Sequence, residues 1–161
     1  MSGLLVDLAD GLGRITSALR AALPASVTVE RSGGAFDGGE IRRQVTQAPA
    51  VVLACLGVSD YQRRGDGGWS VTAQLAVYVL TRDAPPGPPR DLLALSLTTT
   101  VLRAVARANW DGPDGFGVVE ADSLEASNLY SGDLDAIAVA LWAVTWRQEF
   151  RLAFTSPAII T

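Results

Sequence analysis

Residues 69–82 decide the fold, and they read Trp69-Ser70-Val71-Thr72-Ala73-Gln74-Leu75-Ala76-Val77-Tyr78-Val79-Leu80-Thr81-Arg82. Successive side chains of a β-strand point to opposite faces of its sheet, so the alternation assigns each residue to one face. One face receives Trp69, Val71, Ala73, Leu75, Val77 and Val79, and the other receives Ser70, Thr72, Gln74, Ala76, Tyr78 and Leu80. The pattern predicts a long strand in a sheet with one drier and one wetter face.

Further strands are predicted on both sides of this segment. An apolar strand runs from Ala50 to Leu56, where Gly57 closes it, and the longest strand runs from Ala136 to about Leu152. Trp142, Val144 and Trp146 share one side of that last strand because single residues separate them. Shorter extended pieces are predicted at 27–30, 41–46 and 118–121, residues 124–130 stay ambiguous, and residues 131–133 turn the chain.

Two amphipathic helices are predicted, one before the strands and one between them. The first has its apolar stripe at Leu4, Leu8, Leu12, Ile15, Leu19 and Leu23. It runs from about Gly3 to about Leu23, with Ser2 as its N-cap and Pro24 as its stop. The second begins at Arg90, after the proline-rich connector 84–89, and follows the line Leu93, Leu97, Val101, Val105 and Ala108.

These elements predict an α+β fold in which a mostly antiparallel sheet carries two amphipathic helices on one face. The chain has 161 residues, which fits a single domain over residues 1–161. A flexible, glycine-rich loop is expected near residues 32–48, and an apolar C-terminal tail at residues 153–161 is expected to cover its own domain or to dock on a neighbour.

The composition argues against catalysis. The chain has no His, no Lys and a single Cys, so the usual general base, the usual metal ligand and the Schiff-base amine are missing. All 13 basic residues are Arg and face 17 acidic ones, for a net charge of −4, which does not suit nucleic-acid binding. An assembly or binding role is therefore expected, and no enzyme activity.

Individual candidate residues have a structural and a functional interpretation, and the structural one is preferred for each. Cys55 is expected to be a buried thiol that acts as a small hydrophobe, not a nucleophile. The tight basic pairs Arg42-Arg43 and Arg63-Arg64 are expected to be solvated loop charges, with contact to phosphate or an acidic partner as the alternative. Asp133 and Asp135 could form a carboxylate pair, but solvent contacts are expected of them.

The glycine-containing segments predict turns and no ligand site. The acidic loops at 36–40, 65–68 and 111–115 lack the oxygen spacing of a calcium loop, and Asp and Gly tolerate the dihedral angles of tight turns. Gly11-Leu12-Gly13 and residues 65–68 are too sparse to cradle a phosphate. Trp142 and Trp146 are expected in the core or in a subunit contact. No catalytic, cofactor-binding or metal-binding residue is predicted, and no cofactor.

The location is predicted from the lack of membrane signals. Asp7, Asp10 and Arg14 interrupt the apolar residues at the N-terminus, so a signal peptide is not expected. No apolar stretch approaches the roughly 20 residues of a membrane-spanning helix. The protein is expected to be made and kept in a cytoplasm, without a membrane partner.

The order of segments resembles the tail terminator family of Mu-like bacteriophages. Gln47-Ala48-Pro49-Ala50-Val51-Val52-Leu53-Ala54-Cys55-Leu56-Gly57 is similar to that family's alanine-proline-alanine, apolar strand and glycine signature. An amphipathic helix and a short valine strand precede it, as in the family. Downstream, residues 71–81, 90–107 and 135–150 resemble the family's central strand, second helix and closing strand. The resemblance covers about residues 4 to 152, and none of its motifs is catalytic.

The resemblance implies a structural role in the virion. Tail terminators form hexameric rings that cap the tail tube, stop its polymerisation and present a surface to the head and neck. The implied partners are other copies of this chain, the tail tube protein, a sheath protein where there is one, and the head–tail connector or neck. DNA would pass through the lumen without specific binding. The resemblance places the protein in the virion, at the head-proximal end of the tail, after assembly in the cytoplasm of the bacterial host.

Two alternatives remain open at this point. The chain could be a neck or head–tail joining subunit of the same virion, or a small-ligand-binding or enzymatic α+β domain. A ring-sized oligomer would favour assembly, and a monomer with a closed pocket would favour ligand binding.

Overall fold

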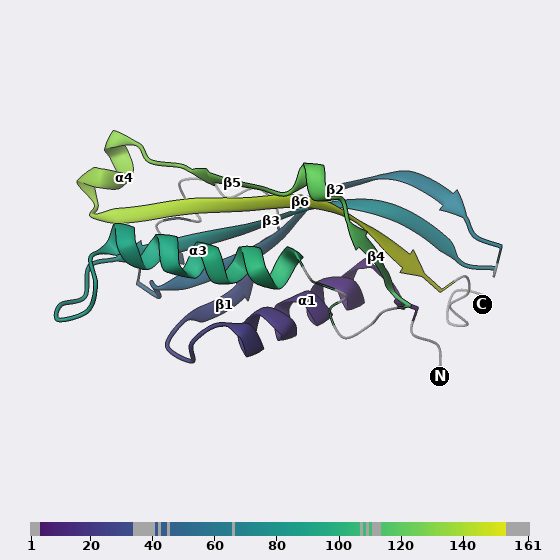
Figure 1. Cartoon of the computed structure of the whole chain (residues 1–161), viewed down its shortest axis with the longest axis horizontal. Helices are drawn as coiled ribbons and strands as arrows, with labels where there is room; N and C mark the ends of the chain where they lie inside the picture. Colours follow the sequence, from purple (N-terminus) through teal and green to yellow (C-terminus); the bar gives the residue numbers. More distant parts are fainter. Residues whose placement is uncertain are drawn as a thin grey trace.

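The computed structural model describes residues 4–33, 41, 43–44, 46–65, 67–106, 108, 110 and 114–153. The elements follow in the order α1 (Leu8–Ala22), β1 (Thr28–Arg31), β2 (Ala50–Arg63), β3 (Trp69–Arg82), α3 (Arg90–Ala106), β4 (Phe116–Val119), the 3₁₀ turn η1 (Ala121–Ser123), β5 (Glu125–Asn128), α4 (Gly132–Ala136) and β6 (Val139–Leu152). Figure 1 shows their arrangement around one long, twisted sheet.

The six strands form a single sheet in the order β1-β2-β3-β6-β4, and β5 also pairs with β6. β3 and β6 form its spine, because they pair antiparallel over their whole length, from Trp69 opposite Leu152 to Arg82 opposite Val139. β1 joins β2 in parallel, and the remaining pairs are antiparallel. The predicted α+β fold with a mostly antiparallel sheet is confirmed, and the central strand has its predicted bounds.

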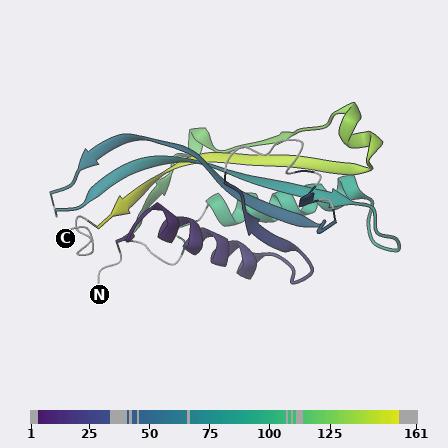
Figure 2. The same cartoon turned by 180° about the vertical axis from the view of Figure 1, so that it is seen from behind.

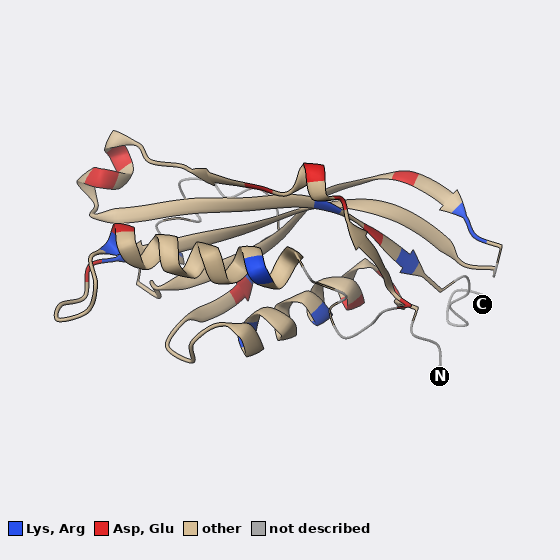
Figure 3. Ribbon diagram, viewed as in Figure 1, with Lys and Arg blue, Asp and Glu red and all other residues tan. Residues whose placement is uncertain are grey.

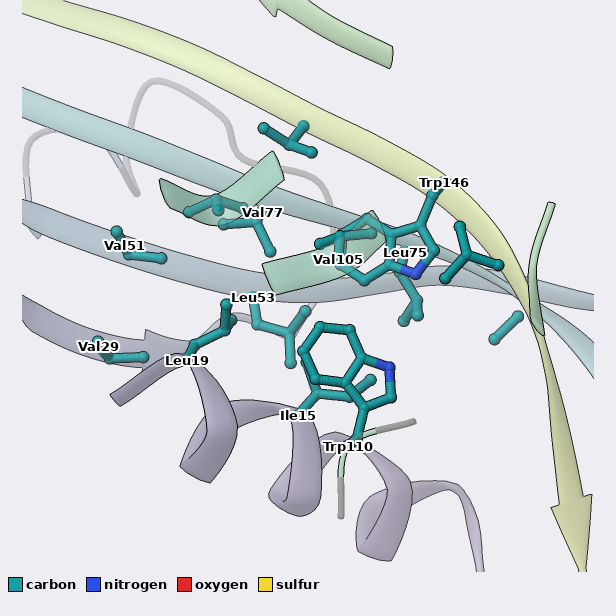
Figure 4. Close-up of a cluster of buried hydrophobic side chains, with 14 of the residues drawn as sticks. Ile15, Leu19, Val29, Val51, Leu53, Leu75, Val77, Val105, Trp110 and Trp146 are labelled. Atoms are coloured by element: carbon teal, nitrogen blue, oxygen red, sulfur yellow. The ribbon is translucent and has the colours of Figure 1, made fainter. Parts of the chain in front are cut away.

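α1 and α3 cover the same face of the sheet, as predicted, and Figures 1 and 2 show them side by side beneath it. The buried side chains of both helices pack against the face of β3 that carries Val71, Ala73, Leu75, Val77 and Val79, and together they form one apolar core. Figure 4 shows part of this core, including Ile15, Leu19, Val29, Val51, Leu53, Leu75, Val77, Val105, Trp110 and Trp146. Trp142 packs at its border, so the predicted common side of Trp142, Val144 and Trp146 is confirmed.

A buried amide anchors the segment after α3 to β6. The Gln148 side chain is fully buried, and its Oε1 accepts hydrogen bonds from Trp110 Nε1 at 2.8 Å and Trp146 Nε1 at 3.2 Å. Its Nε2 donates to the carbonyl oxygens of Gly117 at 2.9 Å and Ala108 at 3.4 Å. Both ends of the amide are therefore satisfied inside the core, as a buried polar group requires.

The opposite face of the sheet carries a second core, which corrects the prediction of a wetter face. Near the start of β6 this face buries Val52, Ala54, Ala76, Tyr78, Leu80, Val139, Leu141 and Ala143. Leu134 of α4 packs onto it, together with Ile41 and Ala48. The strand pattern misses this because short segments far away in the sequence cover the face. Exposed polar side chains remain further along it, at Gln74 and Arg147.

The first helix begins at Leu8, five positions later than the predicted Gly3, and Ser2 lies outside the described residues. Asp7 is the N-cap, and its carboxylate accepts a hydrogen bond from Asp10 N at 2.8 Å. Leu5 forms an isolated parallel bridge to Leu152, so the chain before Asp7 lies against the end of β6 and does not extend the helix. Inside α1, Gly11 lets the helix approach β6, because a Cβ there would lie 2.6 Å from Phe150 Cε2.

β2 is twice as long as predicted, because Gly57 does not end it. The pairing with β3 continues to Arg63 opposite Trp69, with register shifts between Cys55 and Gly57 and between Ser59 and Gln62. Each shift inserts an extra residue into β2, the mark of a β-bulge, and Asp60 in the second has a positive φ of 54°. The glycine is thus a point of bending within a continuing strand.

Smaller differences concern the connecting segments. The predicted strand at 41–46 is wrong, since Ile41, Arg43 and Gln44 are helical, and the predicted strand 118–121 is observed as β4 at Phe116–Val119. The ambiguous segment forms β5. The predicted turn at 131–133 is the start of α4, because Ser131 Oγ accepts from Leu134 N, and β6 consequently begins at Val139 and not at Ala136. Most of the expected loop at 32–48, and the tail from residue 154, lie outside the described residues.

Candidate interaction surfaces

The distal parts of β2 and β3 extend beyond the helices, and we call residues 56–70 the arm. Figures 1 and 2 show this arm reaching past α1 at the end of the molecule where β6 ends. β1 pairs with β2 only over Ala50–Leu53, so within the described chain no strand flanks the outer edge of β2 along the arm. An open strand edge presents backbone N–H and C=O groups to a partner.

The tip of the arm carries an aromatic and basic cluster. Tyr61 meets Trp69 edge-on, with ring centroids 4.8 Å apart and an interplanar angle of 62°. Arg63 Cζ lies 5.1 Å from the centroid of the Trp69 ring, in the range of a cation–π contact. Gly67 closes the turn with a positive φ of 86°, and Arg64 N donates to Gly68 O at 2.8 Å. The turn therefore holds these side chains together at the tip of the arm.

The arm also exposes apolar side chains, as α3 does at Leu92 and Leu95 and the segment around β5 and α4 does at Leu129, Tyr130 and Ile137. Leu56 is 43%, Val58 46% and Tyr61 66% exposed. A single exposed apolar residue needs no explanation, but three of them beside an open strand edge favour an interaction site, although Leu56 and Val58 lie on opposite faces of β2. This arrangement is the strongest functional signal in the described chain.

A second surface lies at the opposite end of the molecule, and we call it the end cleft. It is a cavity of about 420 Å³ between the start of α3, the end of β5, α4 and the start of β6. Its lining consists of Asp83, Pro89, Arg90, Asp91, Asn128, Tyr130, Asp135, Val139, Ala140, Leu141 and Trp142. Figure 1 shows α4 and the start of α3 at the far end from the arm.

Arg90 organises the charges of the end cleft. Its guanidinium bonds Asp83 Oδ2 at 2.8 Å and Asp135 Oδ1 at 2.9 Å, and its backbone N donates to Asp83 Oδ1 at 2.8 Å. The backbone and side-chain hydrogen bonds from Arg90 lower the pKa of Asp83 below its ordinary value. Three carboxylates with one guanidinium leave the cleft negatively charged, and Figure 3 shows the acidic positions on α4 beside the start of α3.

The end cleft offers charged and aromatic groups that can bind a ligand or a partner. Two of its carboxylates are bound to Arg90, and the chain has no His or Lys to act as a base beside a hydroxyl group. Within the described ranges, no group of three or more His, Cys, Asp or Glu side chains is arranged to hold a metal ion. Tyr130 and Trp142 offer aromatic surface beside the acidic groups, which suits a side chain that is both apolar and positively charged.

The residues singled out by the sequence are dispersed over the structure. Cys55 is half-buried against the main core, with its Sγ 3.7 Å from Gly57 O, so it is less buried than expected. Arg63 lies at the arm tip on Trp69, and not simply in solvent as expected. Asp133 and Asp135 lie on α4, where Asp135 binds Arg90 and is thus more than a solvent contact. Gly11 and Gly13 lie inside α1 and not in a loop.

Several candidates fall on positions outside the described residues. These are Arg42, the acidic glycine loop 36–40, Asp66 of the second loop, and residues 111–113 of the third. Sequence reasoning missed the arm and the end cleft altogether. The signal for the arm was present, because Gly67-Gly68 separates two extended segments and is flanked by Tyr61 and Trp69. The end cleft has no such local signal, since four distant segments form it.

Comparison with models of known protein families found no matching family, and comparison with curated proteins found no match. Among the described residues, no helix combines the length and the apolar character needed to cross a lipid bilayer.

Proposed function

We propose that this chain is a structural subunit of a phage tail terminator, which forms a ring by contacts with its own copies and caps the tail tube. The observation that carries the proposal is the arm, with its open β2 edge and its exposed Leu56, Val58 and Tyr61. A ring requires heterologous contacts, in which one surface meets a different surface of the next copy. The arm and the end cleft are two candidate surfaces for such contacts, and they lie at opposite ends of the molecule.

The partners follow from the same proposal. The ring would bind the tail tube on one side and the connector or neck on the other, and DNA would pass through its lumen. A net charge of −4 suits a passage through which DNA moves without adhering, because like charges repel the phosphates. The protein would act in the virion and no bond would be made or broken.

Light scattering on the purified full chain tests the oligomer. The expected result is a species with the mass of a hexamer, seen as a ring by electron microscopy. A strictly single-copy protein at high concentration would contradict the proposal, and turnover of a substrate by that monomer would replace it with a ligand-binding or enzymatic function.

Genetic deletion in the phage tests the place of the ring. Loss of a terminator is expected to give tails of uncontrolled length, because nothing stops polymerisation of the tube. Tails of normal length that fail to join heads would instead indicate a neck or head–tail joining subunit. Adding the purified protein to growing tubes should shorten them if it terminates, and should leave their length unchanged if it joins heads.

A further inference from the structure

The outer edge of β2 presents backbone groups to a further strand over residues 54–62. β1 pairs with β2 only as far as Leu53, and no strand of the described chain flanks β2 beyond that point. Leu53 O accepts a hydrogen bond from Ser32 N, so the N–H and C=O of Leu53 face this edge. Val58 lies four β3 positions further along, opposite Ala73, and the alternation of the backbone turns its N–H and C=O to the same edge. Such groups are a template for strand pairing.

The exposed apolar side chains of the arm suit an added strand better than a flat partner surface. Leu56 and Val58 lie on opposite faces of β2, where they are 43% and 46% exposed. A flat surface covers one face of a sheet, whereas the side chains of an added strand alternate between both faces. In strand addition, main-chain hydrogen bonds give the affinity and the alternating side chains give the specificity. The arm is therefore suited to an extended segment with apolar residues on both of its sides.

The C-terminal tail of the chain has the sequence of such a segment. Ile159 and Ile160 are adjacent, so in an extended conformation they lie on opposite sides of the backbone, as Leu56 and Val58 do. β-branched residues favour strands, and the residue before Pro157 is biased to an extended conformation. The tail carries no charged residue, so it can join the edge without burying a charge of its own. Residues 154–161 read Phe154-Thr155-Ser156-Pro157-Ala158-Ile159-Ile160-Thr161.

We propose that residues 154–161 of one copy add as a strand to the outer edge of β2 in the next copy, along residues 54–62. This inference rests on the proposed ring function and names its subunit contact. The lengths agree, because residues 54–62 span positions 70–76 of β3, about 24 Å, and eight extended residues reach about 27 Å. The contact is heterologous, as a ring requires, because the donor follows β6 and the acceptor is β2.

The order of the strands favours a neighbouring copy as the donor. β6 ends with Leu152 opposite Trp69, and Ala153 N donates to Leu5 O at 2.7 Å. From that point the tail would have to cross β3 and β2 to reach the outer edge of its own copy, about 14 Å at about 4.8 Å per strand. The crossing would use about half of the tail. The tail of a copy that lies beside β2 can instead pair with the edge over its full length.

Two β2 strands from different copies suit the edge less well. Each has register shifts between Cys55 and Gly57 and between Ser59 and Gln62. Such bulges bend a strand and turn its edge away from a straight partner. A short segment can follow the bend of one strand, whereas two bulged strands would have to match their bends.

Removal of residues 154–161 tests the contribution of the tail to association. The deletion spares every described helix and strand, since β6 ends at Leu152. Self-association, measured by light scattering, should weaken by about thirtyfold or more, the change expected when an interface hot spot is lost. Ile159→Asp combined with Ile160→Asp should have the same effect, and Ile159→Val combined with Ile160→Val is the matched control that should keep the ring. Circular dichroism and thermal melting check that each variant is folded.

Crosslinking identifies the chain that supplies the strand. Cys55→Ser removes the single cysteine of the chain, and Val58→Cys or Ile159→Cys then places one thiol in each of two proteins. A bismaleimide that spans about 8 Å reaches direct and diagonal neighbours on adjacent strands. The mixed proteins should form covalent heterodimers, and a chain with both cysteines should form a ladder of multimers. Leu92→Cys, at an exposed position of α3, replaces Val58→Cys in the control and should form neither.

The outcomes separate this inference from the proposed function. Rings that persist without residues 154–161 would overturn the inference and leave the terminator proposal standing. A double-cysteine chain that crosslinks only within itself would also overturn it, because the tail would then cover its own arm. Crosslinked dimers of the Val58→Cys protein alone would overturn it in favour of pairing between two β2 edges. A wild-type chain that never associates would overturn both proposals.

Discussion

The two ends of the sheet are made by the same three strands, β2, β3 and β6, and yet they are covered very differently. At the end where β6 begins, both faces are buried: α3 covers one, and α4 with Ile41 and Ala48 covers the other. Along the arm, the exposed Leu56, Val58 and Tyr61 have no such cover in the described chain. We call the end where β6 begins the packed end.

The difference shows that similar strand sequences can serve two purposes. Leu80 at the packed end and Val58 on the arm are both apolar strand residues, but Leu80 is fully buried and Val58 is 46% exposed. Burial at the packed end stabilises the monomer, whereas the exposed residues of the arm contribute free energy only when a partner covers them. Substitutions should therefore affect folding at one end and association at the other.

The largest effect on folding is expected from Gln148→Leu, near the base of the arm. The substitution leaves two indole N–H groups and two carbonyl oxygens in the core without their partner. An unsatisfied buried group costs about 1–3 kcal/mol, so we expect the free energy of unfolding to fall by about 3–5 kcal/mol after some relaxation. Urea denaturation measures this free energy. Gln74→Leu is the control, because Gln74 is exposed on the neighbouring strand β3, and it should change the free energy of unfolding by less than about 0.5 kcal/mol.

The comparison between the two ends is tested directly by Leu80→Ala and Val58→Ala. Removing the Leu80 side chain leaves a cavity in the second core, so the free energy of unfolding should fall by about 2–4 kcal/mol. Val58→Ala should lower it by less than about 1 kcal/mol. Equal losses in the two variants, measured by the same denaturation, would show that the arm is packed as tightly as the rest of the sheet.

Alanine substitutions at the two glycines of α1 should change the stability of the fold in opposite directions. A Cβ at Gly11 would lie 2.6 Å from the Phe150 ring, and overpacking costs about 1–3 kcal/mol, so Gly11→Ala should be destabilising despite its better helix propensity. Gly13→Ala meets nothing within 4 Å and should stabilise by about 0.5–1 kcal/mol. Thermal melting of both variants checks the signs, and a stabilised Gly11→Ala protein would place α1 further from β6.

The smallest effect concerns the ion pair that joins α3 to the rest of the packed end. Hydrogen bonds from Arg90 lower the pKa of Asp83 in the folded protein, so its contribution to stability is present above the ordinary value of 3.8 and is lost as the pH falls through the lower folded value. Asp83→Asn should therefore be less stable than the wild type at neutral pH, and the difference should shrink in that acidic range. A difference that does not change with pH would exclude this ionic origin; Asp122→Asn controls for the loss of one exposed charge.

Much of the fold could be predicted because its signals are local. Alternation over residues 69–82 gave the bounds of β3, and helical periodicity gave α3 and all but the beginning of α1. The start of α1 was missed because Leu4 continues the apolar stripe in the sequence, whereas its neighbour Leu5 pairs with Leu152 in the structure. An apolar stripe in the sequence does not tell whether a residue lies in the helix or contacts the sheet, because its side chain is buried in both cases.

The candidate surfaces were harder to predict because they depend on residues distant in the sequence. Gly57 looked like a strand end, and only the pairing with β3 shows that β2 bends there and continues. The end cleft joins Asp83, Arg90, Tyr130 and Asp135 from separate elements. The two pairs of basic residues were noticed in the sequence, but the stacking of Arg63 on Trp69 requires the hairpin that brings positions 63 and 69 together.

The sequence by itself determined the class of fold, the central strand and most of the two long helices, because backbone periodicity acts over short distances. The tertiary structure alone decided which strand faces are covered. Val77 and Leu80 are buried by α3 and by the α4 side respectively, whereas Tyr61 on the arm is left for a partner. Burial depends on which distant segments arrive at a face, and no local pattern of apolar residues carries that information.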